Sequence, residues 1–107
     1  MSSQSKIAAL LCAASLLPGL ALASSDEAWN EMRADVSAKC LAAVADNIDS
    51  PKAVVDPFGS ERFGLALVSG KPKGADGTVS IICVYDKQTK AVEIGSELTD
   101  EMLEGGQ

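Results

Sequence analysis

Side chains that carry out most enzymatic chemistry are missing from this chain or isolated within it. The sequence has no histidine, which is the commonest general base and a common zinc ligand. It also lacks the glycine patterns that bind nucleotide phosphates and the G-x-S-x-G motif of serine hydrolases. Residues 70–77 come nearest to a glycine-rich loop, but they lack the phosphate-binding spacing and favour a hairpin loop. We therefore expect no enzyme, no catalytic residue and no cofactor.

Acidic side chains are plentiful, and two adjacent pairs, Asp26-Glu27 and Asp100-Glu101, could bind calcium in principle. Neither pair has the alternating oxygen ligands of a calcium-binding loop, and Asp26-Glu27 suits the first turn of a helix. We therefore expect no metal site. A small-ligand or metal carrier stays open as an alternative function. A small hydrolase built on two carboxylates is a second alternative, although the chain is short for a substrate cleft.

The first 23 residues have the composition of a cleavable signal peptide. Lys6 precedes an uncharged apolar run over residues 7–17, Pro18-Gly19 then interrupts any helix, and an A-x-A sequence ends at Ala23. The apolar run is shorter than the roughly 20 residues that a membrane span needs, which disfavours an uncleaved anchor. We predict cleavage after Ala23 and export to the bacterial periplasm, with full secretion as the alternative. We expect no stable membrane insertion of the cleaved chain.

In this interpretation residues 24–107 form one small acidic domain. Cleavage removes Lys6 from the nine basic residues and none of the 15 acidic ones, so the domain is more acidic than the precursor, whose net charge is −6. Such a surface repels nucleic acid and anionic lipid, because both are bound through clustered Lys and Arg. It suits a cationic protein partner, although net charge also keeps a small domain in solution.

Three cysteines occur, Cys12, Cys40 and Cys83. Cys12 leaves with the signal peptide, and an oxidising compartment would let the remaining two form a single disulfide. Two buried free thiols or a bridge between two chains are the alternatives. The chain has no C-x-x-C spacing of the kind that lowers a thiol pKa. The pattern therefore predicts a structural disulfide between Cys40 and Cys83 rather than a redox site.

The residues after the leader predict a helix. Residues 24–27 have the S-x-x-E form of a capping box, and the helix that they open extends to about Asp46. Its apolar side chains recur at steps of three and four residues, which is typical of a helix with one buried face. They are Trp29, Met32, Val36, Cys40 and Ala43. Charged residues such as Asp35 lie on the opposite side, and residues 47–51 end the helix, with turn formers at 49–51.

Alternation with a period of two then predicts strands over residues 63–68, 78–86 and 91–94, with a weaker edge strand over 53–55. The segment 78–86 is apolar on both faces, which favours a central strand. A short C-terminal helix over residues 98–103 is expected behind Ser96 or Thr99.

These elements predict an α+β fold in which the N-terminal helix packs across a three- to four-stranded antiparallel sheet. Cys40 lies on the apolar stripe of the helix. Cys83 shares one strand face with Val79, Ile81 and Tyr85. The two cysteines would then meet between the layers, and the disulfide would fasten the helix to the sheet.

The segment 55–64 combines recognition side chains with turn formers, and loops on a rigid scaffold are where binding groups gather. Its candidate interface residues are Asp56, Phe58, Glu61 and Arg62. The alternative is structural: Asp56-Pro57 and Gly59-Ser60 make turns while Phe58 enters the core. Trp29 could anchor a ligand, but its place on the helix stripe favours packing in the core.

The function that these features favour is a noncatalytic, exported interaction protein. An inhibitor, an immunity-type protein and an envelope or host-adaptation factor are examples of that class. Its partner would be another protein.

Overall fold

The computed structural model describes residues 25–105 of the chain, and the signal-peptide prediction for residues 1–23 lies outside them. In chain order the elements are α3 (Asp26–Val44), β1 (Ile48–Val55), β2 (Phe63–Pro72), β3 (Val79–Asp86), β4 (Val92–Ile94), β5 (Leu98–Thr99) and α4 (Asp100–Leu103). The strands pair antiparallel in the order β1-β2-β3-β4, and β5 pairs with β3 beyond the end of β4.

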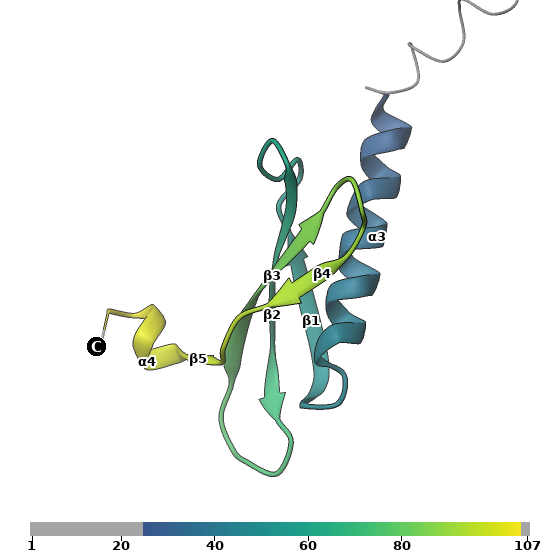
Figure 1. Ribbon diagram of the computed structural model, residues 1–107. Helices are drawn as coiled ribbons and strands as arrows, with labels where there is room; N and C mark the ends of the chain where they lie inside the picture. Colours follow the sequence, from purple (N-terminus) through teal and green to yellow (C-terminus); the bar gives the residue numbers. More distant parts are fainter. Residues whose placement is uncertain (1–24, 106–107) are drawn as a thin grey trace, which may run out of the picture.

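The long helix α3 lies against one side of this sheet, and the short α4 extends away from it at the C-terminal end (Figure 1). The predicted α+β architecture is confirmed, with a helix packed on an antiparallel sheet and a short C-terminal helix. Segment 79–86 is a central strand as expected, since β3 pairs with β2 on one side and with β4 and β5 on the other.

The cap of α3 lies one residue later than the capping-box pattern predicts. Ser25 is the N-cap, and its side chain accepts a hydrogen bond of 3.1 Å from the backbone N–H of Ala28. Asp26 and Glu27 occupy the first turn, where the positive end of the helix dipole stabilises acidic side chains. The buried side chains of the helix are Val36, Cys40 and Val44. Val44 thus takes the place expected of Ala43, which is exposed.

The first strand is longer than the alternation predicts. β1 begins at Ile48, so residues 49–51, which were expected to form a turn, lie inside a strand. The pairing with β2 shifts register between Asp49 and Lys52, and Ser50 has a φ of 47°. A bulge on an edge strand accommodates Pro51, because a bulged residue need not donate to the ladder.

The core lies between α3 and the inner face of the sheet. Its buried members are Val36, Cys40, Val44, Ile48, Ala66, Val68, Val79, Ile81, Cys83 and Tyr85. The disulfide between Cys40 and Cys83 is present, with Cα atoms 5.9 Å apart and both residues fully buried. It joins the helix to the central strand, as predicted.

Small residues on β2 let the helix approach closely. A Cβ atom at Gly64 would lie 2.7 Å from Cγ2 of Val36, which is well inside van der Waals contact. The larger Leu65 and Leu67 point to the other face of β2, away from the core. The face of β2 with the smaller side chains is therefore the buried one, because the helix packs closely against it.

Candidate functional site

The candidate interface lies at one end of the molecule, which we call the head. Three segments form it: the loop 56–62 between β1 and β2, the N-terminal turns of α3, and the turn 87–91 between β3 and β4 (Figure 1). The contacts described below hold these segments together, although they are far apart in the sequence. The head is where the candidate residues Asp56, Phe58, Glu61 and Arg62 are found.

Asp56 orders the loop through one of its two carboxylate oxygens. Its Oδ1 accepts hydrogen bonds from the backbone N–H groups of Phe58 (3.1 Å) and Gly59 (2.9 Å). These bonds favour the ionised form and lower the pKa of the Asp56 carboxyl, with Gly59 as the larger cause. Gly59 has a φ of 72°, a conformation that other residues seldom adopt. The turn chemistry expected at Asp56-Pro57 is thus present.

Two basic side chains fix the loop from neighbouring elements. Nζ of Lys87 donates hydrogen bonds to the carbonyl oxygens of Phe58 (2.8 Å) and Ser60 (2.7 Å). Arg33 of α3 donates from NH1 to the carbonyl oxygen of Pro57 at 2.6 Å. The loop backbone is therefore tied both to the β3–β4 turn and to the helix.

Aromatic rings complete the head. The rings of Trp29 and Phe58 meet edge to face with centroids 5.0 Å apart. Nζ of Lys87 lies 5.2 Å from the Trp29 ring centre, and the guanidinium of Arg33 lies 5.7 Å from that of Phe58. Phe58 is nevertheless 57% exposed. The head therefore presents an aromatic side chain that is held in one position and still open to solvent.

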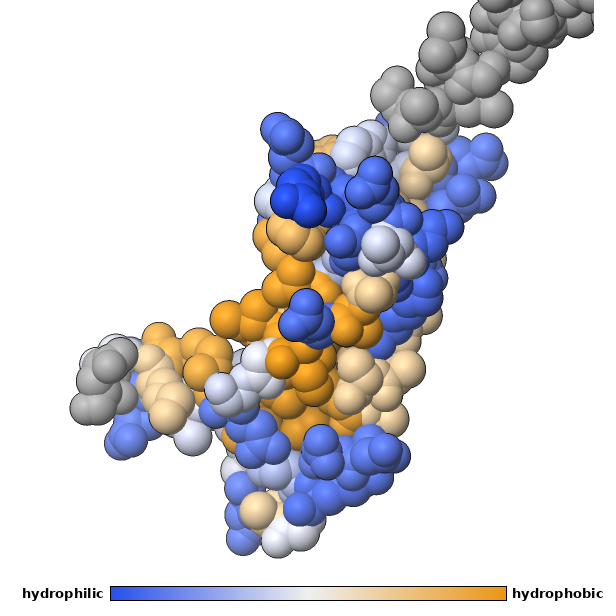
Figure 2. Space-filling view, in the orientation of Figure 1, coloured by the Kyte–Doolittle hydropathy of each residue, from blue (hydrophilic) through white to orange (hydrophobic). Residues whose placement is uncertain are grey.

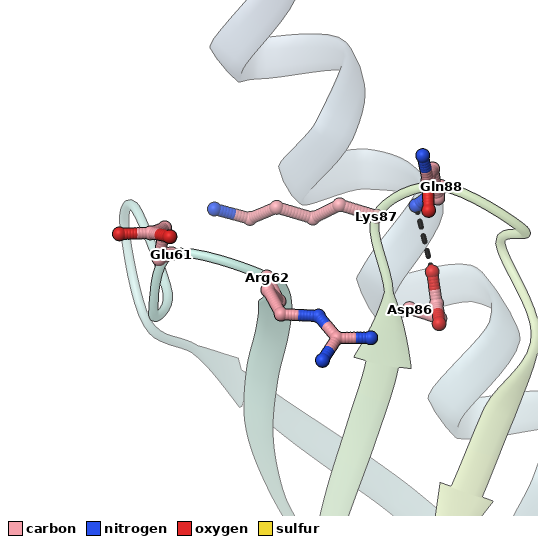
Figure 3. Close-up of a pocket in the computed structure, with 5 residues that line it drawn as sticks. All are labelled: Glu61, Arg62, Asp86, Lys87 and Gln88. Atoms are coloured by element: carbon pink, nitrogen blue, oxygen red, sulfur yellow. Dashed lines mark hydrogen bonds between the residues drawn. The ribbon is translucent and has the colours of Figure 1, made fainter.

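A shallow hollow of about 400 Å³ lies between the loop 56–62 and the β3–β4 turn (Figure 3). Its lining residues are Glu61, Arg62, Asp86, Lys87 and Gln88. Asp86 accepts hydrogen bonds from the backbone N–H groups of Gln88 (2.8 Å) and Thr89 (3.0 Å). Those two bonds, with Thr89 as the larger cause, lower the pKa of its carboxyl. Figure 3 shows the Lys87 side chain extending toward the loop that carries Glu61. The hollow offers both signs of charge.

The structure thus brings together all four residues predicted for the interface, in different roles. Asp56 builds the turn, Phe58 is exposed instead of entering the core, and Glu61 and Arg62 line the hollow. The sequence interpretation missed Arg33 and Lys87, and it favoured the core over a binding role for Trp29. Trp29 was expected in the core, but it lies outside the buried cluster and packs against Phe58. Its position in the first turn of the helix, beyond the span of the sheet, is the signal that could have indicated this.

A second polar cluster lies between α3 and the sheet. The hydroxyl of Tyr85 donates a hydrogen bond to Oδ2 of Asp35, and Nζ of Lys39 lies 3.2 Å from the same oxygen. Asp35 was expected on the solvent side of the helix, yet it points to the sheet. Burial, followed by the bond to Asp35, raises the pKa of Tyr85 to about 12. The same bond lowers the pKa of Asp35.

Neither cluster has the layout of a metal site. Within residues 25–105, no group of three or more His, Cys, Asp or Glu side chains is close enough to hold a metal ion. Over the same residues, no helix has the length and apolar content needed to cross a membrane. No family model, curated protein or solved structure matches this chain.

Proposed function

We propose that this chain is a noncatalytic interaction protein, exported to the periplasm, that binds another protein through the head. The observation that carries the proposal is that Phe58 is exposed although hydrogen bonds from neighbouring elements hold its loop in place. Aromatic residues at the centre of a contact supply much of its binding energy. A loop that is already ordered loses little conformational entropy when a partner docks.

The arrangement around Phe58 also indicates what the partner offers. An apolar side chain would pack on the exposed ring, beside a hollow that holds Arg62 and Lys87 together with Glu61 and Asp86. A partner loop with an apolar residue flanked by charged residues fits this surface. The acidic excess of the whole chain adds long-range attraction for a partner of net positive charge.

Export is the second part of the proposal. It is supported by the leader composition of residues 1–23 and by the buried disulfide between Cys40 and Cys83, because disulfides persist mainly in oxidising compartments. N-terminal sequencing of the protein recovered from the periplasm of an exporting host should begin at Ser24. Recovery of the uncleaved chain from the cytoplasm would contradict export.

The binding test uses the exported protein as bait in an envelope extract, followed by calorimetry with the purified partner. We expect one partner protein in stoichiometric amount, with affinity at least about ten-fold weaker for Phe58→Ala. Ile94→Ala is the matched control, because Ile94 is also an exposed apolar residue, at 38%, but lies in β4 away from the head. Circular dichroism checks that each variant is folded.

Two results would overturn this function. Equal binding by Phe58→Ala and the unaltered protein would exclude the head as the binding surface. Recovery of a bound small molecule with no protein partner would instead support the carrier alternative.

A further inference from the structure

The face of the sheet that α3 does not cover is apolar and exposed. Val54 of β1, Leu67 of β2 and Ile82 of β3 are paired neighbours that form one row across three strands. Their exposed fractions are 71%, 38% and 49%. Leu65 and Val84 pair in the next row of the same face, which ends at the charged Glu93 of β4. We call the five apolar residues the open face.

The open face is shaped for contact. A shallow hollow of about 450 Å³ runs along it, lined in part by Val54, Leu65, Leu67 and Ile82, with Asp56 at its rim. Figure 2 shows apolar residues gathered over the middle of the strands, with hydrophilic residues toward both ends. An antiparallel sheet with one face in water normally carries polar side chains there. A continuous apolar row is therefore a candidate surface for contact with another molecule.

The edges of the sheet, in contrast, are protected from pairing with other strands. The outer edge strand β1 carries Pro51, a register shift and the exposed Lys52. The opposite edge strand β4 is only three residues long. Proline, bulges, lysine and short length are the devices by which proteins prevent edge pairing. Association is thus directed to the face of the sheet.

We propose that a second copy of this chain covers the open face, in a dimer whose two-fold axis runs along the row of Val54, Leu67 and Ile82. Each of these residues then packs near its own counterpart, because it lies on the two-fold axis. Two sheets packed in this way lie about 10 Å apart.

Charge complementarity favours this orientation. The rows on either side of the apolar row carry opposite charges at their β1 ends. Lys52 lies on one side, paired with Ser69, and Asp56 lies on the other, with its backbone N–H bonded to Leu65. A two-fold axis along the central row exchanges the two sides. Lys52 of each copy is thereby placed opposite Asp56 of the other, and two ion pairs form.

The open face alone is too small, so the contact must include the C-terminal arm. A face of three strands, about six residues long, measures roughly 300 Å² in projection, whereas a stable dimer buries about 800 Å² from each copy. The arm of β5 and α4 continues from this sheet and carries the exposed Met102 and Leu103. Leu98 pairs with Ser80 on the same face as Ile82. Apolar side chains of the arm extend the contact beyond the sheet.

The dimer is independent of the proposed binding function. Phe58 packs on Trp29 of the helix, which lies on the opposite side of the sheet from the open face. The head aromatic therefore stays accessible in both copies, and a failure of either proposal leaves the other intact.

The first test measures mass against concentration by sedimentation equilibrium, with exported protein from about 1 μM to 1 mM. We expect the mass to approach twice that of the monomer. Ile82→Lys should weaken the dimer at least about ten-fold, since it places two like charges at the axis. Ile94→Lys is the matched control, an isoleucine 38% exposed on the helix-side face of β4, and it should dimerise normally. If Ile82→Lys does not fold, Leu67→Thr takes its place.

The second test examines the orientation. Lys52→Glu should weaken the dimer several-fold, whereas Lys73→Glu in the β2–β3 loop should not. A zero-length carbodiimide cross-link between Lys52 and Asp56 should appear between copies when two isotopic forms are mixed. A monomer at every concentration would overturn the proposal. A dimer whose affinity is unchanged in Ile82→Lys would also overturn it. So would the finding that a different protein, or the chain's own C-terminal arm, covers the open face.

Discussion

At the residue scale, the pair of Tyr85 and Asp35 shows most directly how packing changes chemistry. Tyr85 is 2% exposed, and its hydroxyl reaches an aspartate on the helix. Burial and the neighbouring carboxylate both disfavour the phenolate, so the neutral phenol is the form that the fold stabilises. The stabilisation of the neutral phenol is fully present below pH 10, and it is lost as the pH rises through the folded pKa of about 12. At the acid end the contribution of the pair is lost as the pH falls through the lowered pKa of Asp35.

Tyr85 is the only tyrosine in the chain, so its ionisation is directly visible in the ultraviolet absorbance near 295 nm. We expect a titration midpoint near 12 in the folded protein and near 10 after denaturation. Asp35→Asn should lower the folded midpoint, because it removes the negative charge and leaves burial in place. Asp46→Asn, beyond the C-terminal end of α3, is the control and should leave the midpoint unchanged. A folded midpoint of 10 would contradict the assigned pair.

Residue-level prediction from sequence succeeded where a side chain acts within its own segment. Asp56 and Phe58 were identified because the loop 56–62 contains its own turn signals. Trp29, Arg33 and Lys87 contribute to the same surface from two other elements, and nothing in their local sequence indicates which loop they meet. Asp35 was misplaced for the same reason, since its partner Tyr85 is 50 residues away.

At the scale of elements, the strongly periodic segments were predicted well. α3 and β3 each present one regular apolar pattern, which identifies the buried face and places Cys40 and Cys83 opposite each other. β1 was missed over its first half because Asp49, Ser50 and Pro51 are turn formers in isolation. Pairing with β2 overrides those preferences by means of a bulge.

The disulfide is the covalent link between the helix and the sheet, and it closes a long loop with a sequence separation of 43. Replacing both cysteines by alanine should lower the free energy of unfolding by about 4 kcal/mol in the chain-entropy description. Urea denaturation followed by fluorescence of the single tryptophan, Trp29, measures the loss. A difference below about 1 kcal/mol would show that the bridge contributes little.

Because both cysteines are fully buried, reductant should reach the disulfide only after the protein opens. The rate of reduction by dithiothreitol under native conditions should therefore follow the rate of unfolding, and it should rise with urea in the same proportion. Rapid reduction without urea would contradict this burial.

At the scale of the whole molecule, the surfaces are divided by role. The head gathers aromatic and basic side chains, the open face is apolar, and residues 91–105 carry five acidic residues and no basic one. Composition alone could not predict this division. Alternate side chains of one strand point to opposite faces of the sheet, so one set enters the core and the other forms the open face. The sequence interpretation recognised that both faces of β3 are apolar, but it had no means of showing that only one is covered.

The C-terminal arm provides a test of this division. None of the α4 side chains is buried, whereas Leu98 and Thr99 pair with β3. A chain that ends at Thr99 should keep its free energy of unfolding within about 0.5 kcal/mol, while a chain that ends at Glu97 should be less stable because the β5 pairing is lost. Urea denaturation at low micromolar concentration separates folding from association. The chain that ends at Thr99 should dimerise more weakly, since it lacks the apolar Met102 and Leu103. Equal dimer affinity would contradict the proposed dimer, because the open face alone is too small for a stable contact between copies.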